Sequence, residues 1–236
     1  MLMRQKKSLS MGIIMGISFI GVLLIILSPV FGGKNGLEYS DALFNKLAKG
    51  SSFFIPELTA SLKDVQKEEI SVSIKMDNAD QAAKAARVLA QGLAKTSVQG
   101  SEVKINGNLV KMLSTVLDDS TAMYYDRGAE VKSRYSMDER DVMSTWWGVL
   151  NRVAKELQKA RKAEETNVIF EVMKKGIEPA YNFYGIEAQK VSDKALTVLG
   201  MLAFYILYTM WWGYAIFYMF DGLGLSMKKA KVKQEV

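Results

Sequence analysis

LTVLGMLAFYILYTMWWGYAIFYMF, residues Leu196–Phe220, is a run of 25 residues without a formal charge. As an α-helix with a rise of roughly 1.5 Å per residue it extends about 37 Å, which is enough to cross a hydrocarbon core of about 30 Å with some tilt. A second apolar run, Gly12–Phe31, lies near the other end of the chain. The sequence therefore predicts two transmembrane helices on either side of one domain.

The predicted fold class is an α+β membrane protein, with two transmembrane helices and a mainly helical extracytoplasmic domain that contains a small β-sheet. The expected segments are a cytoplasmic tail at 1–11, a first span at 12–31, the extracytoplasmic domain at 32–194, a second span at 195–221 and a basic cytoplasmic tail at 222–236. We expect the cytoplasmic membrane to be the location of the protein.

The net charge of +6 is concentrated at the two ends of the chain. The N-terminal tail carries Arg4, Lys6 and Lys7, and the C-terminal tail carries Lys228, Lys229, Lys231 and Lys233 against one acid, Glu235. Short basic segments beside membrane spans remain in the cytoplasm. Both termini are therefore predicted to be cytoplasmic, and the basic charge reflects topology and not nucleic-acid binding.

A short basic segment followed by an apolar run is also the layout of a signal peptide. The region after Gly12–Phe31 lacks the small-x-small pair of a cleavage site, and the apolar run exceeds the usual length of roughly 7–15 residues. We predict an uncleaved anchor. Its Gly12 and Gly16 have the GxxxG spacing that permits close approach of another helix.

The chain contains neither cysteine nor histidine. Without cysteine it cannot form a disulfide scaffold, use a thiol nucleophile, hold an iron–sulfur cluster or attach haem through a thioether. Without histidine it lacks the usual haem ligand, the commonest zinc ligand and the commonest general base near neutral pH. We expect no metal, no cofactor and no enzymatic activity, although a carboxylate-based site remains open.

The domain is expected to combine a few strands with helices. Residues 69–76 form the clearest strand, because Ile70, Val72, Ile74 and Met76 alternate with polar residues. A second strand is expected at 102–106, and Tyr124-Tyr125 with Val131–Tyr135 suggest a hairpin of two more. If the strands are parallel, their crossover is right-handed.

Helices are predicted from apolar periodicity and caps. The first covers about 37–49 with Ser40 or Asp41 near the start, and a long one begins at the capping-box spacing Ser136-x-x-Glu139 and extends to about 160. The others cover 57–67, 79–94 after a cap at Asp77 or Asn78, 109–117, 168–177, and 181–194 running into the second span. Met143, Trp146, Leu150, Val153, Leu157 and Ala160 form a heptad-like seam, which we expect to pack on the domain and not in a coiled coil. Phe53–Ile55 would pack on the core or rest on the membrane surface.

Two groups of carboxylates were considered as candidate sites. Asp118 and Asp119 adjoin one another, and Asp138, Glu139 and Asp141 lie close together. Such groups bind a metal or divide acid and base roles only if they converge in a pocket. Helix ends explain both groups, so we do not predict a metal site.

The second span is the candidate functional surface. Nine of the 17 residues from Phe204 to Phe220 are aromatic, although aromatic belts normally gather at the two interfaces. Buried Tyr and Trp side chains need hydrogen-bond partners, so we expect packing against other subunits, with lipid exposure or a quinone-like or lipid ligand as alternatives. The predicted partner-packing residues are Gly12, Gly16, Tyr205, Tyr208, Trp211, Trp212, Tyr214 and Tyr218. Asp221 is expected at the cytoplasmic boundary.

The leading functional hypothesis is a non-catalytic accessory or scaffold subunit of a cytoplasmic-membrane complex. Its expected partners are other membrane protein subunits or further copies of itself, together with the lipid bilayer, and no nucleic acid. A ligand-binding or sensory ectodomain that signals through a partner is the alternative. A third reading is a carboxylate-dependent enzyme, which requires a pocket that holds Asp118, Asp119 or Glu139 beside a base.

Overall fold

The computed structural model describes residues 5–65 and 69–225. The chain divides into two compact units, and the described parts of these are 5–44 with 190–225, and 45–189. Arg4 and the basic residues Lys228, Lys229, Lys231 and Lys233, on which the predicted topology rests, lie outside the described residues, and so does Glu235.

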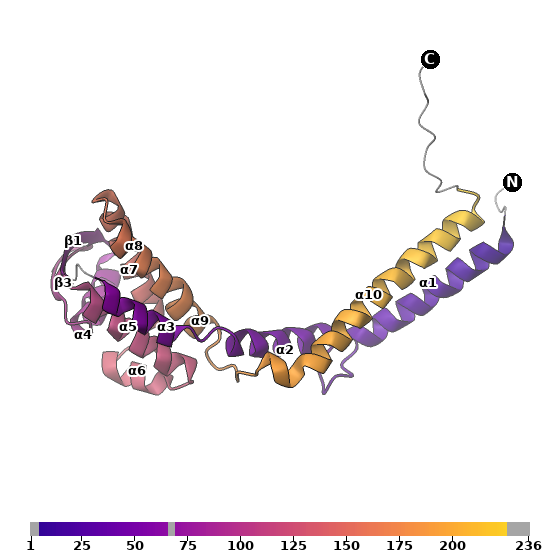
Figure 1. Ribbon diagram of the computed structural model, residues 1–236, viewed down its shortest axis with the longest axis horizontal. Helices are drawn as coiled ribbons and strands as arrows, with labels where there is room; N and C mark the ends of the chain where they lie inside the picture. Colours follow the sequence, from indigo (N-terminus) through magenta and orange to yellow (C-terminus); the bar gives the residue numbers. More distant parts are fainter. Residues whose placement is uncertain (1–4, 66–68, 226–236) are drawn as a thin grey trace, which may run out of the picture. The chain divides into compact units, whose positions relative to one another are not determined.

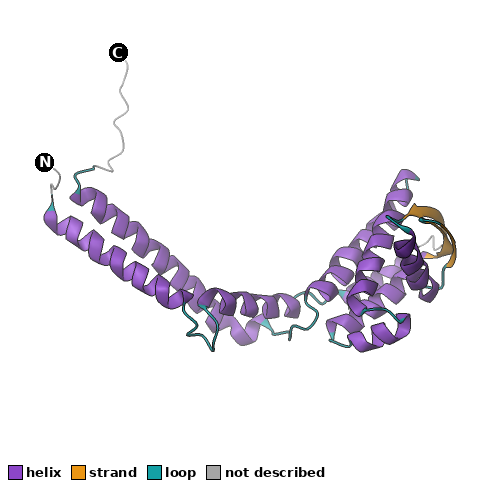
Figure 2. Ribbon diagram, turned by 180° about the vertical axis from the view of Figure 1, so that it is seen from behind, coloured by secondary structure: helices purple, strands orange, loops and turns teal. Residues whose placement is uncertain are grey.

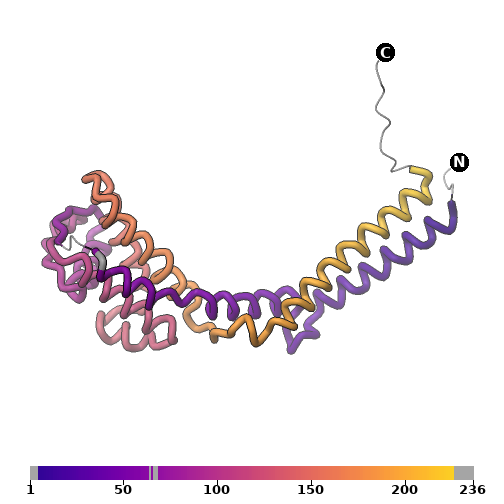
Figure 3. Tube along the Cα trace, in the orientation of Figure 1, coloured from indigo at the N-terminus to yellow at the C-terminus, as the bar shows by residue number. Residues whose placement is uncertain are grey.

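The first unit is built on two long helices, α1 (Lys6–Leu27) and α10 (Val191–Gly222), which run side by side (Figure 1). Both are long and apolar enough to cross a membrane, with mean hydropathies of 2.6 and 1.5 in their most apolar windows. Helix α1 begins six residues before the predicted span 12–31, and α10 begins four residues before the predicted span 195–221. Helix α1 ends at Leu27, where the chain approaches Pro29. Figure 3 follows the Cα trace of this antiparallel pair.

Gly12 permits the close contact between these two helices. A Cβ atom added there would lie 2.5 Å from the Met219 nitrogen and 2.9 Å from the Ala215 oxygen, so any larger residue would separate the backbones. Farther along, the rings of Phe19 and Tyr208 stack with centroids 4.1 Å apart, and the Tyr208 hydroxyl donates to the Phe19 carbonyl at 3.3 Å.

Helix α2 (Gly36–Gly50) follows α1 and includes the boundary between the units. Its start is a reciprocal cap: the Glu38 N–H donates to the Asn35 side chain at 2.9 Å, and the Asn35 N–H donates to the Glu38 carboxylate at 3.0 Å. The predicted cap at Ser40 or Asp41 was therefore wrong.

The second unit contains a sheet of three described strands, β1 (Glu69–Lys75), β2 (Lys95–Gln99) and β3 (Glu102–Asn108). The strand order is β1-β3-β2 with both pairings antiparallel, so Val72 faces Ile105 and Val98 faces Val103. One face packs Ile70, Ile74, Val103 and Ile105 into the core, as predicted. Figure 2 shows the strands in orange.

Helices complete the domain. They are α3 (Ile55–Ser61) with a 3-10 turn at Leu62–Asp64, α4 (Ala79–Gln91), α5 (Leu109–Tyr124), α6 (Gly128–Tyr135), α7 (Glu139–Lys159), α8 (Ala163–Val172), a π-helical turn η2 (Met173–Ile177), and α9 (Glu178–Asn182). The predicted α7 seam is buried from Met143 to Leu157, within the domain, whereas Ala160 is exposed at the C-cap. Asn78 caps α4 as one of the two predicted residues, accepting from the Gln81 N–H at 2.8 Å.

The predicted hairpin at 124–135 is wrong, because Tyr124 ends α5 and Val131–Tyr135 belong to α6. Val131 and Tyr135 are four residues apart and both buried, which is helical spacing. The parallel alternative for the strands is also excluded. Strand β2 was missed because none of its residues is buried, so its sequence shows no alternating apolar face.

Two helix boundaries also differ from prediction. Asp138 caps α7, where it accepts from the Arg140 N–H at 3.0 Å, while Ser136 ends α6 in a left-handed conformation with φ 49°. The predicted helix 181–194 is interrupted, since α9 ends at Asn182 and α10 begins at Val191. Phe53 packs partly on the core and Ile55 is buried, which favours the core reading of that segment.

Candidate functional site

The buried carboxylate of Asp119 accepts hydrogen bonds from three side chains of the described domain. Asp119 lies on α5 and has no solvent-exposed surface. Its oxygens accept hydrogen bonds from Tyr135, from the Trp146 indole at 3.0 Å and from the Arg134 guanidinium at 2.5 Å. The carboxylate therefore joins three helices, α5, α6 and α7.

Burial raises the pKa of the Asp119 carboxyl above its ordinary value, because desolvation penalises the charged form. The donors from Tyr135 and Trp146 and the charge of Arg134 oppose this rise but do not cancel it. Burial and the nearby Asp119 carboxylate likewise raise the pKa of the Tyr135 hydroxyl. Since Asp119 touches no solvent, the geometry suits a structural junction and not a substrate site. The Arg134 side chain is 37% exposed, so it approaches the buried carboxylate from the solvent side.

A second polar cluster lies where the chain enters and leaves the domain. The Lys49 side chain is 2% exposed, and its ammonium contacts the Asp126 carboxylate at 3.1 Å and lies 5.2 Å from the Tyr124 ring centre. Asp126 also accepts from the Gly185 N–H at 2.7 Å, and the Gln189 N–H donates to the Lys46 carbonyl at 3.0 Å. These contacts connect 46–49 with 185–189.

The third feature is a groove of about 350 Å³ between α7 and the η2–α9 segment. Its lining is Met143, Ser144, Trp147, Ile177, Glu178, Tyr181 and Asn182. Met143 and Ile177 are buried, whereas Trp147 and Tyr181 are each 36% exposed. The groove thus has an apolar base, two accessible aromatic side chains and one carboxylate.

The π-helical turn η2 shapes the helix that forms one side of this groove. Single π turns inside α-helices are often found at functional sites. Gly176 in this turn allows close approach of α5, since an added Cβ would lie 3.1 Å from Leu117. The Ser120 hydroxyl on α5, 3.9 Å from that Cβ position, is buried and has no hydrogen-bond partner in the described structure.

The predicted carboxylates do not converge in the structure. Asp118 is exposed beside the buried Asp119 on α5. Glu139 accepts from the Tyr184 hydroxyl at 3.2 Å, and Asp141 lies 3.5 Å from the Lys84 ammonium. Across residues 5–65 and 69–225 no group of three or more acidic side chains is placed to hold a metal. Asp118, Asp119 and Glu139 therefore do not form a shared carboxylate cluster within the described residues.

The predicted partner-packing residues divide between two environments. Gly12 and Gly16 are buried, and Tyr208 contacts Phe19 of the same chain. Trp212 also contacts Phe19, with ring centres 4.7 Å apart, and remains 38% exposed. Tyr205 and Tyr214 are 67% and 51% exposed, whereas Trp211, Tyr218 and Asp221 are half-buried.

Three groups were not identified from the sequence: the donors around Asp119, the Lys49–Asp126 pair and the groove. Trp147 carried a usable signal, because it adjoins the seam residue Trp146 and must therefore point away from the seam on a helix. Asp126 carried none, since its partners lie 77 residues before it and 59 after it.

Comparisons of the chain with protein-family models, with curated protein sequences and with solved structures find no match. The class that the fold and sites define is a mostly helical protein with a small antiparallel sheet and two candidate membrane-spanning helices.

Proposed function

We propose that the protein is an integral membrane protein, anchored by α1 and α10, and that it acts as a non-catalytic accessory or scaffold subunit of a cytoplasmic-membrane complex. In this proposal both termini are cytoplasmic and residues 45–189 lie on the opposite side of the membrane. The basic tails and the even number of candidate spans support that orientation.

The observation that carries the proposal is the set of aromatic side chains that α10 leaves exposed after it packs on α1. Tyr205 and Tyr214 remain mostly exposed, and their hydroxyl groups have no hydrogen-bond partner within the described chain. Transfer of a hydroxyl group from water into hydrocarbon without a hydrogen-bond partner costs a free energy of about 2–7 kcal/mol. Contact with another membrane protein satisfies such groups, and this favours a subunit over an isolated anchor.

Mild-detergent extraction of the tagged native protein, followed by sizing and mass spectrometry, tests the proposal. We expect stoichiometric membrane subunits to co-purify. Replacing Tyr205 and Tyr214 with Phe should reduce their recovery while insertion is retained, because only the two hydroxyl groups are lost.

Replacement of Thr197 by Val is a matched control, since it also removes a hydroxyl from α10 but lies outside the aromatic-rich residues 204–220. Recovery of the protein as a lone monomer would contradict the accessory-subunit proposal and would favour the sensory or ligand-binding alternative.

A further inference from the structure

The groove between α7 and the η2–α9 segment has the chemistry of a small-molecule site. Its volume of about 350 Å³ lies within the range of roughly 300–1,000 Å³ that is usual for ligand pockets, which are mostly apolar and contain a few polar groups. Met143 and Ile177 lie beneath the surface of the groove, with exposed fractions of 0% and 1%, so its accessible apolar surface comes from the Trp147 and Tyr181 rings. These rings can accept a ring or an alkyl stem.

The only formally charged side chain in the lining is Glu178. It is exposed, and its carboxylate has no ion pair or hydrogen bond to any described residue. By contrast, the neighbouring Glu171 pairs with Lys175 at 3.1 Å. A ligand that places a cation at Glu178 would therefore meet an uncompensated negative charge.

The aromatic side chains of the groove favour the same ligand charge. Trp and Tyr rings attract cations at their faces, by about 0.5–1 kcal/mol at exposed sites. One such contact already exists here, since the Arg140 guanidinium carbon lies 5.4 Å from the centre of the Tyr181 ring. Arg140 itself is outside the lining of the groove.

We propose that this groove binds an organic cation in which an apolar ring or stem carries an amidinium, guanidinium or ammonium group. The ring or stem lies against the exposed Trp147 and Tyr181 side chains, and the cation pairs with Glu178. All these residues belong to the unit 45–189, so such binding is independent of whether α10 contacts other membrane proteins.

Benzamidinium is a suitable probe, with benzamide as its neutral counterpart of nearly the same shape. The full chain in lipid nanodiscs would be titrated while the indole N–H signals are followed by NMR, with the Trp147 signal assigned through Trp147→Phe. Trp211 and Trp212 report any partition of the probe into the bilayer. We expect saturable shifts at Trp147, with a Kd on the order of millimolar for so small a ligand.

Two variants should change the affinity for benzamidinium in opposite directions. Glu178→Gln should weaken binding about two- to fivefold, because it removes the paired charge. Arg140→Gln should strengthen it, because it removes a like charge beside the groove. Glu171→Gln is the control and should leave the affinity unchanged.

The proposal is overturned if the Trp147 signal shows no saturable shift up to the solubility limit of benzamidinium. Equal binding of benzamide, or unchanged binding by Glu178→Gln, would also overturn it. Shifts confined to Trp211 and Trp212 would show partition into the bilayer and would count against the groove.

Discussion

At the scale of single residues, Asp119 shows how a buried charge is accommodated in this domain. Three side chains from two other helices donate to its carboxylate, which has no contact with solvent. Breaking such a buried cluster by removal of one partner typically costs about 3–5 kcal/mol for ion pairs. Asp119 is therefore a junction on which the mutual packing of α5, α6 and α7 depends.

Because burial raises the pKa of Asp119, the stability of the domain should depend on pH at this residue. A carboxyl whose pKa is higher in the folded state stabilises the fold below its unfolded pKa, near 3.8 here, and this contribution is lost as pH rises through the folded value. The stability of the wild type relative to Asp119→Asn should therefore fall as pH rises above about 4.

Urea unfolding of both proteins across that pH range measures the difference, at about 1.4 kcal/mol for each unit of pKa shift. Asp118→Asn should reduce this trend without abolishing it, because the charge of the exposed Asp118 adds to the rise in the Asp119 pKa while burial remains the main cause. If the stability of the wild type relative to Asp119→Asn instead grew with pH, the three hydrogen-bond donors would lower the Asp119 pKa by more than desolvation raises it.

The sequence indicated Asp119 only as a member of an acidic pair. It placed Trp146 correctly in a buried seam, but it assigned Tyr135 to a strand. The three partners are 15, 16 and 27 residues away along the chain. Hydrophobic periodicity reports which face of an element is buried, and it does not report which polar groups meet there.

At the scale of elements, the pair α1–α10 combines a close approach at Gly12 with an aromatic contact at Phe19. Phe19 stacks on Tyr208 at 4.1 Å and contacts Trp212 at 4.7 Å. Helices pack closely in membranes where small residues allow it, because hydrocarbon provides no hydrophobic driving force between them. Part of the face that we predicted for partner subunits is therefore used within the chain.

The absence of cysteine in the sequence makes this pairing directly testable. Oxidation of the double variant Phe19→Cys with Tyr208→Cys should give an intramolecular cross-link, detected by altered mobility in non-reducing gels. Phe19→Cys with Tyr205→Cys is the matched control, since Tyr205 is 67% exposed and is not in contact with Phe19. Equal cross-linking of both pairs would argue against the register of the two helices.

Several elements followed from local sequence rules, and others did not. Strand β1 and the α7 seam agree with the expected periodicity because each buries one regular face. Asn78 caps α4 through its side chain, as local capping rules predict. Strand β2 and the Asp138 cap were missed. Strand β2 buries none of its residues, so only its pairing with β3 defines it. Ser136 and Asp138 are two residues apart, and both offer an oxygen to a helix start.

At the scale of the whole molecule, the chain consists of a helix pair formed by its two ends and a domain formed by its middle. The two connections to the domain are held together at its base by Lys49, Asp126 and Gly185. Because these contacts join the entering and leaving segments of the chain, a domain with its own core can be inserted between two helices that are far apart in sequence.

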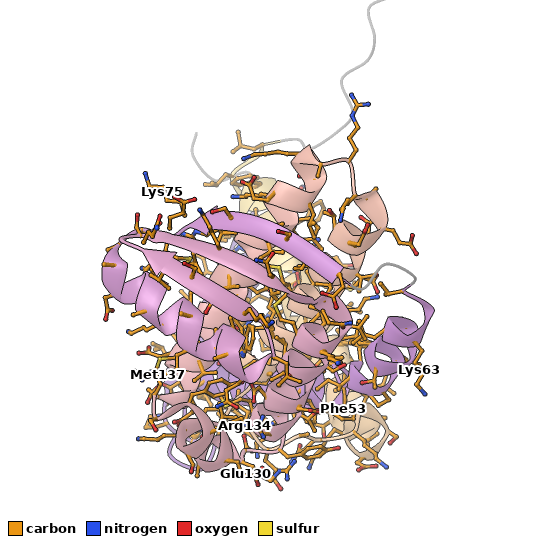
Figure 4. All side chains as sticks on the ribbon, turned by 90° about the vertical axis from the view of Figure 1, so that its left-hand side faces the viewer. Phe53, Lys63, Lys75, Glu130, Arg134 and Met137 are labelled. Atoms are coloured by element: carbon orange, nitrogen blue, oxygen red, sulfur yellow. The ribbon has the colours of Figure 1, made fainter. Side chains whose placement is uncertain are left out.

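The proposed membrane orientation predicts which sites are accessible from outside an intact cell. Lys63→Cys lies on an exposed turn of the domain and should react with a membrane-impermeant maleimide (Figure 4). Gln5→Cys, just before α1, should react only after permeabilisation. Labelling of Gln5→Cys in intact cells would contradict a cytoplasmic N-terminus.

The sequence by itself determined the two long apolar helices, the position of the domain between them, the main strand and most helix cores. These features depend on hydropathy and periodicity over neighbouring residues, which are local properties of the chain. Tertiary structure alone decided that Asp119 meets Tyr135 and Trp146, and that Trp147 faces Tyr181 and Glu178 across a groove. These contacts depend on how whole helices pack against each other, and no local sequence pattern encodes that packing.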